Sequence, residues 1–244
     1  MNFIEHVHEP ERLLLVWQGP EGSSRRRFEV AELLRAGEGQ VRLKYLLDTE
    51  CFHAARLEGF DIYPAFRKLE PTYDLGVVET FMRRLPPRKR EDYPQYLEQF
   101  RLRPQTEISD FALLAYTGAK LPGDGFSIIN PLSPLRGKAE VMIEVAGFRH
   151  AADMTLTELS LGQAVTFVTE DGNIKDPNAV AIYADGRKVG FVPRQQTEAV
   201  RALMRHSGIT AQIERINGST ERPLVYLLAR LDGDASFAAQ RRFA

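Results

Sequence analysis

The sequence predicts two domains, an α+β domain followed by a small β-barrel of about six strands with one or two helices. The chain has 244 residues, which exceeds the roughly 100 to 200 residues of one ordinary domain. Apolar residues at helical spacing mix with short strands up to about residue 129, and strand-like segments dominate afterwards. Between them, residues 130–137 contain two prolines and a glycine without any periodicity, as expected of a domain boundary.

These observations give the predicted boundaries. We place the first domain at residues 1–132, a linker at 133–140, the β-barrel at 141–231 and a basic C-terminal tail at 232–244.

The elements of the first domain follow from apolar spacing. Strands are predicted at residues 13–17, 41–47 and 126–129, and residues 28–35 fit either a short helix or a strand. Helices are predicted at 75–85, 91–100 and 110–117. Pro86 and Pro87 end the first of these helices, and the third lies between a capping Asp110 and Gly118.

Segments rich in β-branched and aromatic residues predict the strands of the second domain. They cover residues 141–145, 164–168, 179–183, 189–192, 209–216 and 224–231. Asp185-Gly186 supplies the positive φ of a tight hairpin, and residues 197–205 form the one clear helix.

Composition restricts the class of protein. The formal net charge is −1, so any contact with nucleic acid must be local rather than due to an overall basic surface. The single cysteine, Cys51, suits a reducing compartment. Neither a signal peptide nor a run of about 18 apolar residues is evident. We expect a cytoplasmic protein without membrane contact.

No local motif indicates an enzyme, a cofactor or a metal site. His6 with His8, and Cys51 with His53, are pairs that fall short of the three or four ligands of a zinc site. The glycine-rich residues 118–125 lack the spacing and the Lys-Ser/Thr of a P-loop. A basic cluster at residues 83–90 is open to two interpretations, a solvated helix end or a contact with a nucleic-acid backbone.

Four blocks in the second half resemble the HIRAN domain family in order and spacing. They are residues 145–149, 161–163, 176–180 and 189–194. The resemblance covers about residues 141–231. It implies a six-stranded barrel that captures the 3′ end of single-stranded DNA, and in bacteria such domains also occur on their own.

The resemblance also implies binding residues. Arg149 corresponds to an arginine after the first strand, and its guanidinium suits a phosphate or a base edge. Asp176 would accept a hydrogen bond from a terminal hydroxyl, with Asn173 and Asn178 as further polar candidates. Turn formation by residues 176–178 is the alternative explanation.

End-binding members of the family carry aromatic residues where this chain has His150, Ala151 and Lys175. Base stacking contributes about 1 to 3 kcal/mol per base, and most of it would be lost at these positions. His150 would stack weakly, and Lys175 would hold a phosphate.

The first half resembles the N-terminal subdomain of HipA-type toxin kinases. The likeness covers about residues 13–132 and is carried by residues 41–45, 78–86 and 110–124. In that family the subdomain packs on the kinase core, and in split systems a separate protein of this type restrains the kinase. The glycine-rich loop and catalytic residues of the kinase are absent from this chain.

Two hypotheses follow. In the first, a bacterial, non-catalytic protein binds single-stranded DNA near a 3′ end through the barrel and recruits a partner through its first domain. In the second, the chain is a protein-interaction regulator, an antitoxin-like subunit of a HipA-type kinase, and the barrel is structural.

Overall fold

The computed structural model describes residues 2–20, 26–37, 39–206, 208–219 and 221–233. The chain divides into two compact units. The α+β unit comprises residues 9–97 and 104–133, and the barrel unit comprises residues 2–8, 98–103 and 134–233. Two short N-terminal segments therefore belong to the barrel unit, which the sequence did not indicate. Most of the predicted basic tail lies outside the described residues.

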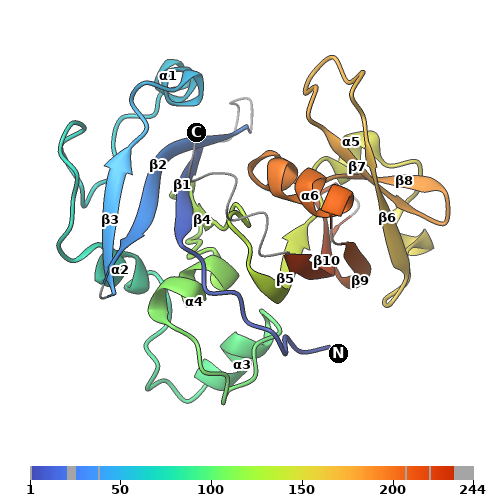
Figure 1. Cartoon of the computed structure of the whole chain (residues 1–244), viewed down its shortest axis with the longest axis horizontal. Coiled ribbons are helices and arrows are strands. Elements are labelled where there is room, and N and C mark those ends of the chain that lie inside the picture. The colour runs from blue at the N-terminus through green and yellow to red at the C-terminus, as the bar shows by residue number, and fades with distance from the viewer. Residues whose placement is uncertain (1, 21–25, 38, 207, 220, 234–244) are drawn as a thin grey trace. The chain divides into compact units, whose positions relative to one another are not determined.

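The α+β unit contains a four-stranded antiparallel sheet with the strand order β3-β2-β1-β4 (Figure 1). Its strands are β1 (Arg12–Gln18), β2 (Arg27–Ala36), β3 (Gln40–Tyr45) and β4 (Phe126–Ile129). Its helices are α1 (Glu50–Leu57), α2 (Val77–Met82), α3 (Tyr93–Glu98) and α4 (Asp110–Thr117). Strand β1 has five consecutive buried residues because it lies inside the sheet, with β2 and β4 as its neighbours.

Helix α4 has its predicted extent, but its N-terminal cap is Ser109 and not Asp110, which is the first residue of the helix. The Ser109 hydroxyl accepts a hydrogen bond from the Ala112 backbone N–H at 3.1 Å, and Gly118 ends the helix in the left-handed region. Both groups satisfy backbone atoms that a helix end leaves unpaired.

The structure decides one alternative for this unit, adds one helix and shortens another. Residues 28–35 lie in strand β2 and not in a helix, because the pairing of β2 with both β1 and β3 outweighs the local pattern. Helix α1, which begins at the capping Thr49, was not predicted. Leu75 is 84% exposed and lies outside α2, because Gly76 starts that helix from a left-handed conformation.

Arg84 joins several segments of the α+β unit. Its side chain is only 8% exposed and forms an ion pair with Asp124 at 2.5 Å. The guanidinium also donates to the carbonyl oxygens of Ala119 (2.6 Å) and Phe126 (3.1 Å) and to the Tyr63 hydroxyl (3.4 Å). A planar fork of donors can satisfy all these acceptors at once.

We expect Arg84→Lys to lower the free energy of unfolding by about 1.5 to 3 kcal/mol, because an ammonium keeps the charge but cannot reach both carbonyl oxygens and the carboxylate. Urea denaturation measures this loss. Arg83→Lys, a change at the exposed neighbour, is the matched control and should leave stability unchanged.

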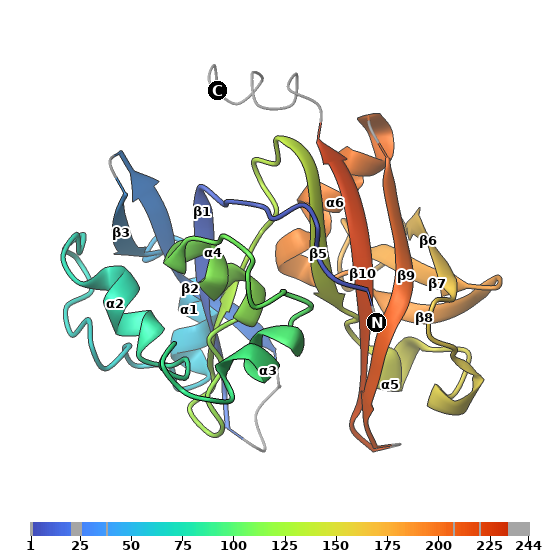
Figure 2. The ribbon, with the colours of Figure 1, turned by 90° about the horizontal axis from the view of Figure 1, so that it is seen from below.

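The barrel unit contains a curled six-stranded antiparallel sheet with the order β5-β10-β9-β6-β7-β8 (Figure 2). Its strands are β5 (Gly137–Glu144), β6 (Ala164–Thr169), β7 (Val180–Ala184), β8 (Arg187–Phe191), β9 (Ile209–Gly218) and β10 (Pro223–Gly233). Its helices are α5 (Phe148–Ala151), the 3₁₀ helix η1 (Leu156–Glu158) and α6 (Arg194–His206). All six predicted strands are confirmed with shifted ends, and the predicted helix 197–205 lies within α6.

The two edges of this sheet meet at one point. Ala146, just after β5, forms an isolated bridge with Phe191 at the end of β8, through N–H to O distances of 2.8 and 2.9 Å. Inside the curl, apolar side chains such as Ile143, Ile182, Val189 and Leu227 are completely buried. The six strands therefore form a half-barrel whose two edges are hydrogen-bonded to each other at Ala146 and Phe191.

A buried ion pair attaches the two N-terminal segments to this sheet. Arg101 Nε donates to Glu214 Oε1 at 2.8 Å, and the two residues are 8% and 5% exposed. Asn2 donates to the same carboxylate from its backbone N (3.1 Å) and from its side-chain Nδ2 (2.8 Å). Burial alone would raise the pKa of Glu214, but these donors and Arg101 lower it.

Candidate nucleic-acid interface

Helix α5 carries two of the predicted binding residues. Gly147 precedes it with a φ of 72°, a conformation that glycine adopts without strain. Phe148 is buried, whereas Arg149 and His150 are exposed. Within the described residues neither of these two side chains forms a hydrogen bond or an ion pair, so the guanidinium of Arg149 is available to an incoming phosphate.

The loop between β6 and β7 carries the other four. Asn173 Oδ1 accepts from the backbone N of Lys175 (3.0 Å) and of Asp176 (3.2 Å), and Asp176 Oδ1 accepts from the backbone N of Asn178 (3.0 Å). These bonds are the turn chemistry that the sequence left open as an alternative. Lys175 is exposed, and in the described part of the chain its ammonium has no partner.

Asp176 also has a partner that the sequence did not assign. Its Oδ2 lies 3.5 Å from Nε of Arg194, the first residue of α6. At that distance the two groups form an ion pair, but they are too far apart for a good hydrogen bond. The carboxylate therefore retains acceptor capacity toward a ligand hydroxyl, next to a cation.

Lys188 on β8 connects the loop to the rest of the surface. Its ammonium lies 2.5 Å from Glu170 Oε1, and the Asn173 side-chain amide donates to the other carboxylate oxygen at 3.0 Å. The ion pair lowers the pKa of Glu170 and raises that of Lys188. Both groups are therefore charged at neutral pH.

Two aromatic rings lie under this ammonium. Lys188 Nζ is 5.0 Å from the ring centroid of Phe191 and 5.9 Å from that of Tyr183, within the range of cation–π contacts. Both rings are partly exposed, although Ile182 and Val189 beside them are completely buried. Neither ring was assigned a role from the sequence, because the register of β7 and β8 shifts beside Tyr183 and interrupts the alternation that would place both rings on an outer face.

Phe191 links the two predicted groups of residues. Its backbone forms the bridge with Ala146, two residues before α5 begins. Its ring lies next to the Lys188 ammonium. Lys188 in turn forms an ion pair with Glu170, which accepts a hydrogen bond from the Asn173 side chain. No direct hydrogen bond or ion pair joins the side chains of α5 to the 173–178 loop among the residues that the structure describes. A series of contacts through Phe191, Lys188 and Glu170 thus connects the segment before α5 to the 173–178 loop.

The basic cluster at residues 83–90 is mostly neutralised. Arg84 is paired with Asp124, Arg88 with Asp110, and Arg90 with Asp92 at 2.6 Å. These pairs favour the interpretation of a solvated, locally balanced surface over that of a phosphate-binding patch.

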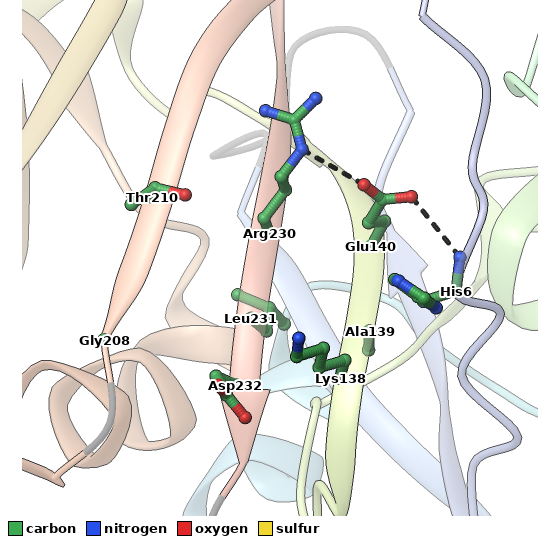
Figure 3. A pocket seen from close by; sticks show the side chains of 9 residues that line it. All are labelled: His6, Lys138, Ala139, Glu140, Gly208, Thr210, Arg230, Leu231 and Asp232. Atoms are coloured by element: carbon green, nitrogen blue, oxygen red, sulfur yellow. Dashed lines mark hydrogen bonds and ion pairs between the residues drawn. The ribbon is translucent and has the colours of Figure 1, made fainter.

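A separate pocket of about 420 Å³ lies on the barrel unit (Figure 3). Its charged residues are opposite one another in the β5–β10 register, Lys138 facing Asp232 and Glu140 facing Arg230, with 3.1 Å between Arg230 Nε and Glu140 Oε1. Glu140 also accepts from the backbone N of Glu5 at 2.6 Å. Because acids balance bases here, this pocket lacks the positive potential that a phosphate backbone requires.

The residues that the structure describes contain no group of three or more His, Cys, Asp or Glu residues able to hold a metal ion. None of their helices has the length and apolar character needed to cross a bilayer.

Comparisons with known proteins concern the second half of the chain. Residues 138–230 match the family model of the HIRAN domain. The HIRAN domain of human HLTF is similar, with 17% identity over 41% of this chain and 83% of that chain, at a TM-score of 0.33. A protein from Lactobacillus plantarum is similar as well, with 26% identity over 39% of this chain and 97% of that chain, also at 0.33.

No curated protein matches the chain. The likeness of the first half to HipA-type kinases stays a prediction, whereas that of the second half to its family is confirmed. Residues 138–230 are thus similar to HIRAN domains.

Proposed function

We propose that this protein binds single-stranded DNA near a 3′ end through its HIRAN domain, without catalysis, and recruits a partner protein through its α+β unit. HIRAN domains are DNA-binding modules, which supports nucleic-acid binding at a general level. Preference for a single strand, for its 3′ end and for a partner belongs to the proposal.

The observation that carries the proposal is a pair of exposed cations, one on α5 and one in the 173–178 loop. Arg149 and Lys175 have no intramolecular partner among the described residues, unlike the paired arginines of the 83–90 cluster. Phe191 and Lys188 connect the two segments through a series of contacts. Unpaired cations of this kind suit the phosphates of a nucleic-acid strand.

Replacing these cations should weaken binding in a salt-dependent way. We expect Arg149→Gln and Lys175→Gln each to reduce the slope of log K against log salt concentration by about 1, since each phosphate contact releases one condensed counterion. Fluorescence anisotropy with a labelled single strand, repeated at several salt concentrations, measures both affinity and slope.

The matched control is Lys44→Gln, because Lys44 is an exposed lysine of the α+β unit without a partner in the described chain. It should bind as the wild type does. Negligible binding of the wild-type protein to any strand would refute the proposal.

End recognition has its own test. Asp176 is the acceptor for a terminal hydroxyl, so the wild type should prefer a strand with a free 3′ hydroxyl over the same strand with a 3′ phosphate. Asp176→Asn should reduce this preference and leave Arg149-dependent binding intact. Equal wild-type affinity for both ends would overturn end recognition and leave strand binding standing.

A second candidate function is that of a protein-interaction regulator, such as an antitoxin-like subunit of a HipA-type kinase. The neutralised arginines of the α+β unit favour it, because such a surface is better suited to a protein than to nucleic acid. Co-purification of the full chain with a kinase encoded beside it tests this function. Failure to retain any such kinase counts against it.

A further inference from the structure

We propose that Tyr183 and Phe191 form the base-stacking platform of this HIRAN domain, and that Lys188 covers the platform until a phosphate draws it away from Glu170. This inference rests on the proposed function and deepens it. It assigns stacking to residues outside the positions where His150, Ala151 and Lys175 leave it deficient.

Strand register places the platform on one side of the sheet. Tyr183 lies opposite Lys188 on β8 and opposite Thr166 on β6. Directly opposed residues of antiparallel strands point to the same side. Ala181 is likewise opposite both Phe191 and Val168, and Lys188 Nζ lies over both rings.

The chemistry of this side suits bases. Thr166 and Val168 extend it toward β6, and both are exposed. The rings, the valine and the threonine bring no charge of their own, whereas Lys188 and Glu170 are charged. The Asp153 carboxylate also lies nearby and accepts from the backbone N of Lys188 at 3.2 Å. Aromatic rings stack with any base, which makes such a surface tolerant of sequence. A duplex keeps its bases stacked inside and offers none to the rings, so the ligand is a single strand.

The Lys188–Glu170 ion pair fits the role of a removable cover. Its side chains are 21% and 24% exposed, so water screens the pair and its separation costs little. A strand phosphate competes with Glu170 for the same ammonium. Transfer of Lys188 from the carboxylate to a phosphate exposes both ring faces and adds one phosphate contact.

Replacing Glu170 and replacing Lys188 should consequently change the affinity for a single strand in opposite directions. We expect Glu170→Gln to tighten binding of a short oligothymidylate several-fold, because it releases Lys188 and removes a negative charge. Lys188→Gln should weaken binding and lower the salt slope by about 1. Charge alone would also give opposite signs, so the gain from Glu170→Gln is compared with that from removing a second carboxylate that does not hold Lys188.

Glu158→Gln is the matched control. Glu158 pairs with Arg187 on the same hairpin at 2.7 Å and does not contact the rings, so its replacement should leave affinity unchanged.

The platform itself is tested with Tyr183→Leu combined with Phe191→Leu, which keeps apolar volume and removes both π faces. Two lost stacking contacts should weaken oligothymidylate binding at least about tenfold. An abasic strand of the same length should bind the wild type and the variant equally. Tyr183→Phe keeps the ring and should behave as the wild type.

Photo-crosslinking of a thiothymidine strand to the wild-type protein gives a second measurement that needs no variant to fold. Adducts at Tyr183 or Phe191 support the inference. Adducts elsewhere, or full affinity of the double leucine variant, overturn the platform and leave DNA binding intact. A wild type that binds no strand overturns both.

Discussion

Arg101→Met should lower the free energy of unfolding of this protein by about 3 to 5 kcal/mol, because it leaves Glu214 buried without its cation. Arg101 Nε and Nη2 donate to the side chain and to the carbonyl oxygen of Glu214, at 2.8 and 3.2 Å. After the replacement, the two hydrogen bonds from Asn2 are those that remain on that carboxylate among the described residues. Urea denaturation of the full chain at neutral pH measures the loss.

The pH dependence separates this cause from a simple loss of packing. The pKa of Glu214 is lowered in the folded wild type, so the carboxylate stabilises the fold above its unfolded pKa of about 4.3, and this contribution is lost as pH falls through the folded pKa. In Arg101→Met burial dominates and raises the folded pKa. The deficit of the variant should therefore shrink on acidification.

A double variant provides the control. Arg101→Met with Glu214→Leu removes both charges and should recover much of the stability lost in the single variant, since no uncompensated charge remains buried. If the double variant were as unstable as Arg101→Met, the loss of stability would come from altered packing and not from a buried unpaired charge.

Gly190→Ala should have an effect of similar size on the barrel unit. Gly190 has a φ of 153°, and a Cβ atom there would lie 2.6 Å from the Ala146 carbonyl oxygen and 2.6 Å from Val145 Cγ1. Since the oxygen belongs to the backbone, it moves only with the bridge between Ala146 and Phe191. Overpacking and backbone strain each cost about 1 to 3 kcal/mol, so we expect a total loss of about 2 to 6 kcal/mol.

Thermal unfolding together with amide hydrogen exchange of Phe191 checks this prediction, because its N–H donates across the bridge. Gly186→Ala is a suitable comparison: it also has a positive φ, 75°, but its Cβ would meet no atom within 4 Å. Gly186→Ala should therefore lower the free energy of unfolding only by the backbone strain. Equal losses in the two variants would contradict the steric argument.

Local chemistry explains which parts of the fold were predictable. Helix α4 agrees with its prediction because Ser109 and Gly118 cap it within the same segment. Helix α5 has only four residues, too few for apolar periodicity, and its one sequence signal is Gly147. Strand β2 was ambiguous because its partners β1 and β3 are not visible in its own residues.

The candidate site also has residues that the sequence predicted and residues that it did not. The sequence and its family likeness pointed to Arg149 and Asp176, but not to the pairing of Asp176 with Arg194. The outward position of Tyr183 and Phe191 was hidden because the register of β7 and β8 shifts between Ile182 and Tyr183. Simple alternation does not survive such an irregularity.

The attachment of Asn2 to Glu214 has a consequence for synthesis on the ribosome. The two residues are 212 positions apart, so Asn2 leaves the exit tunnel long before its partner is made. Domains usually mature in the order in which they are translated. Here the α+β unit can mature first, whereas the barrel unit must wait for β9 before it can capture a segment that was synthesised 212 residues earlier.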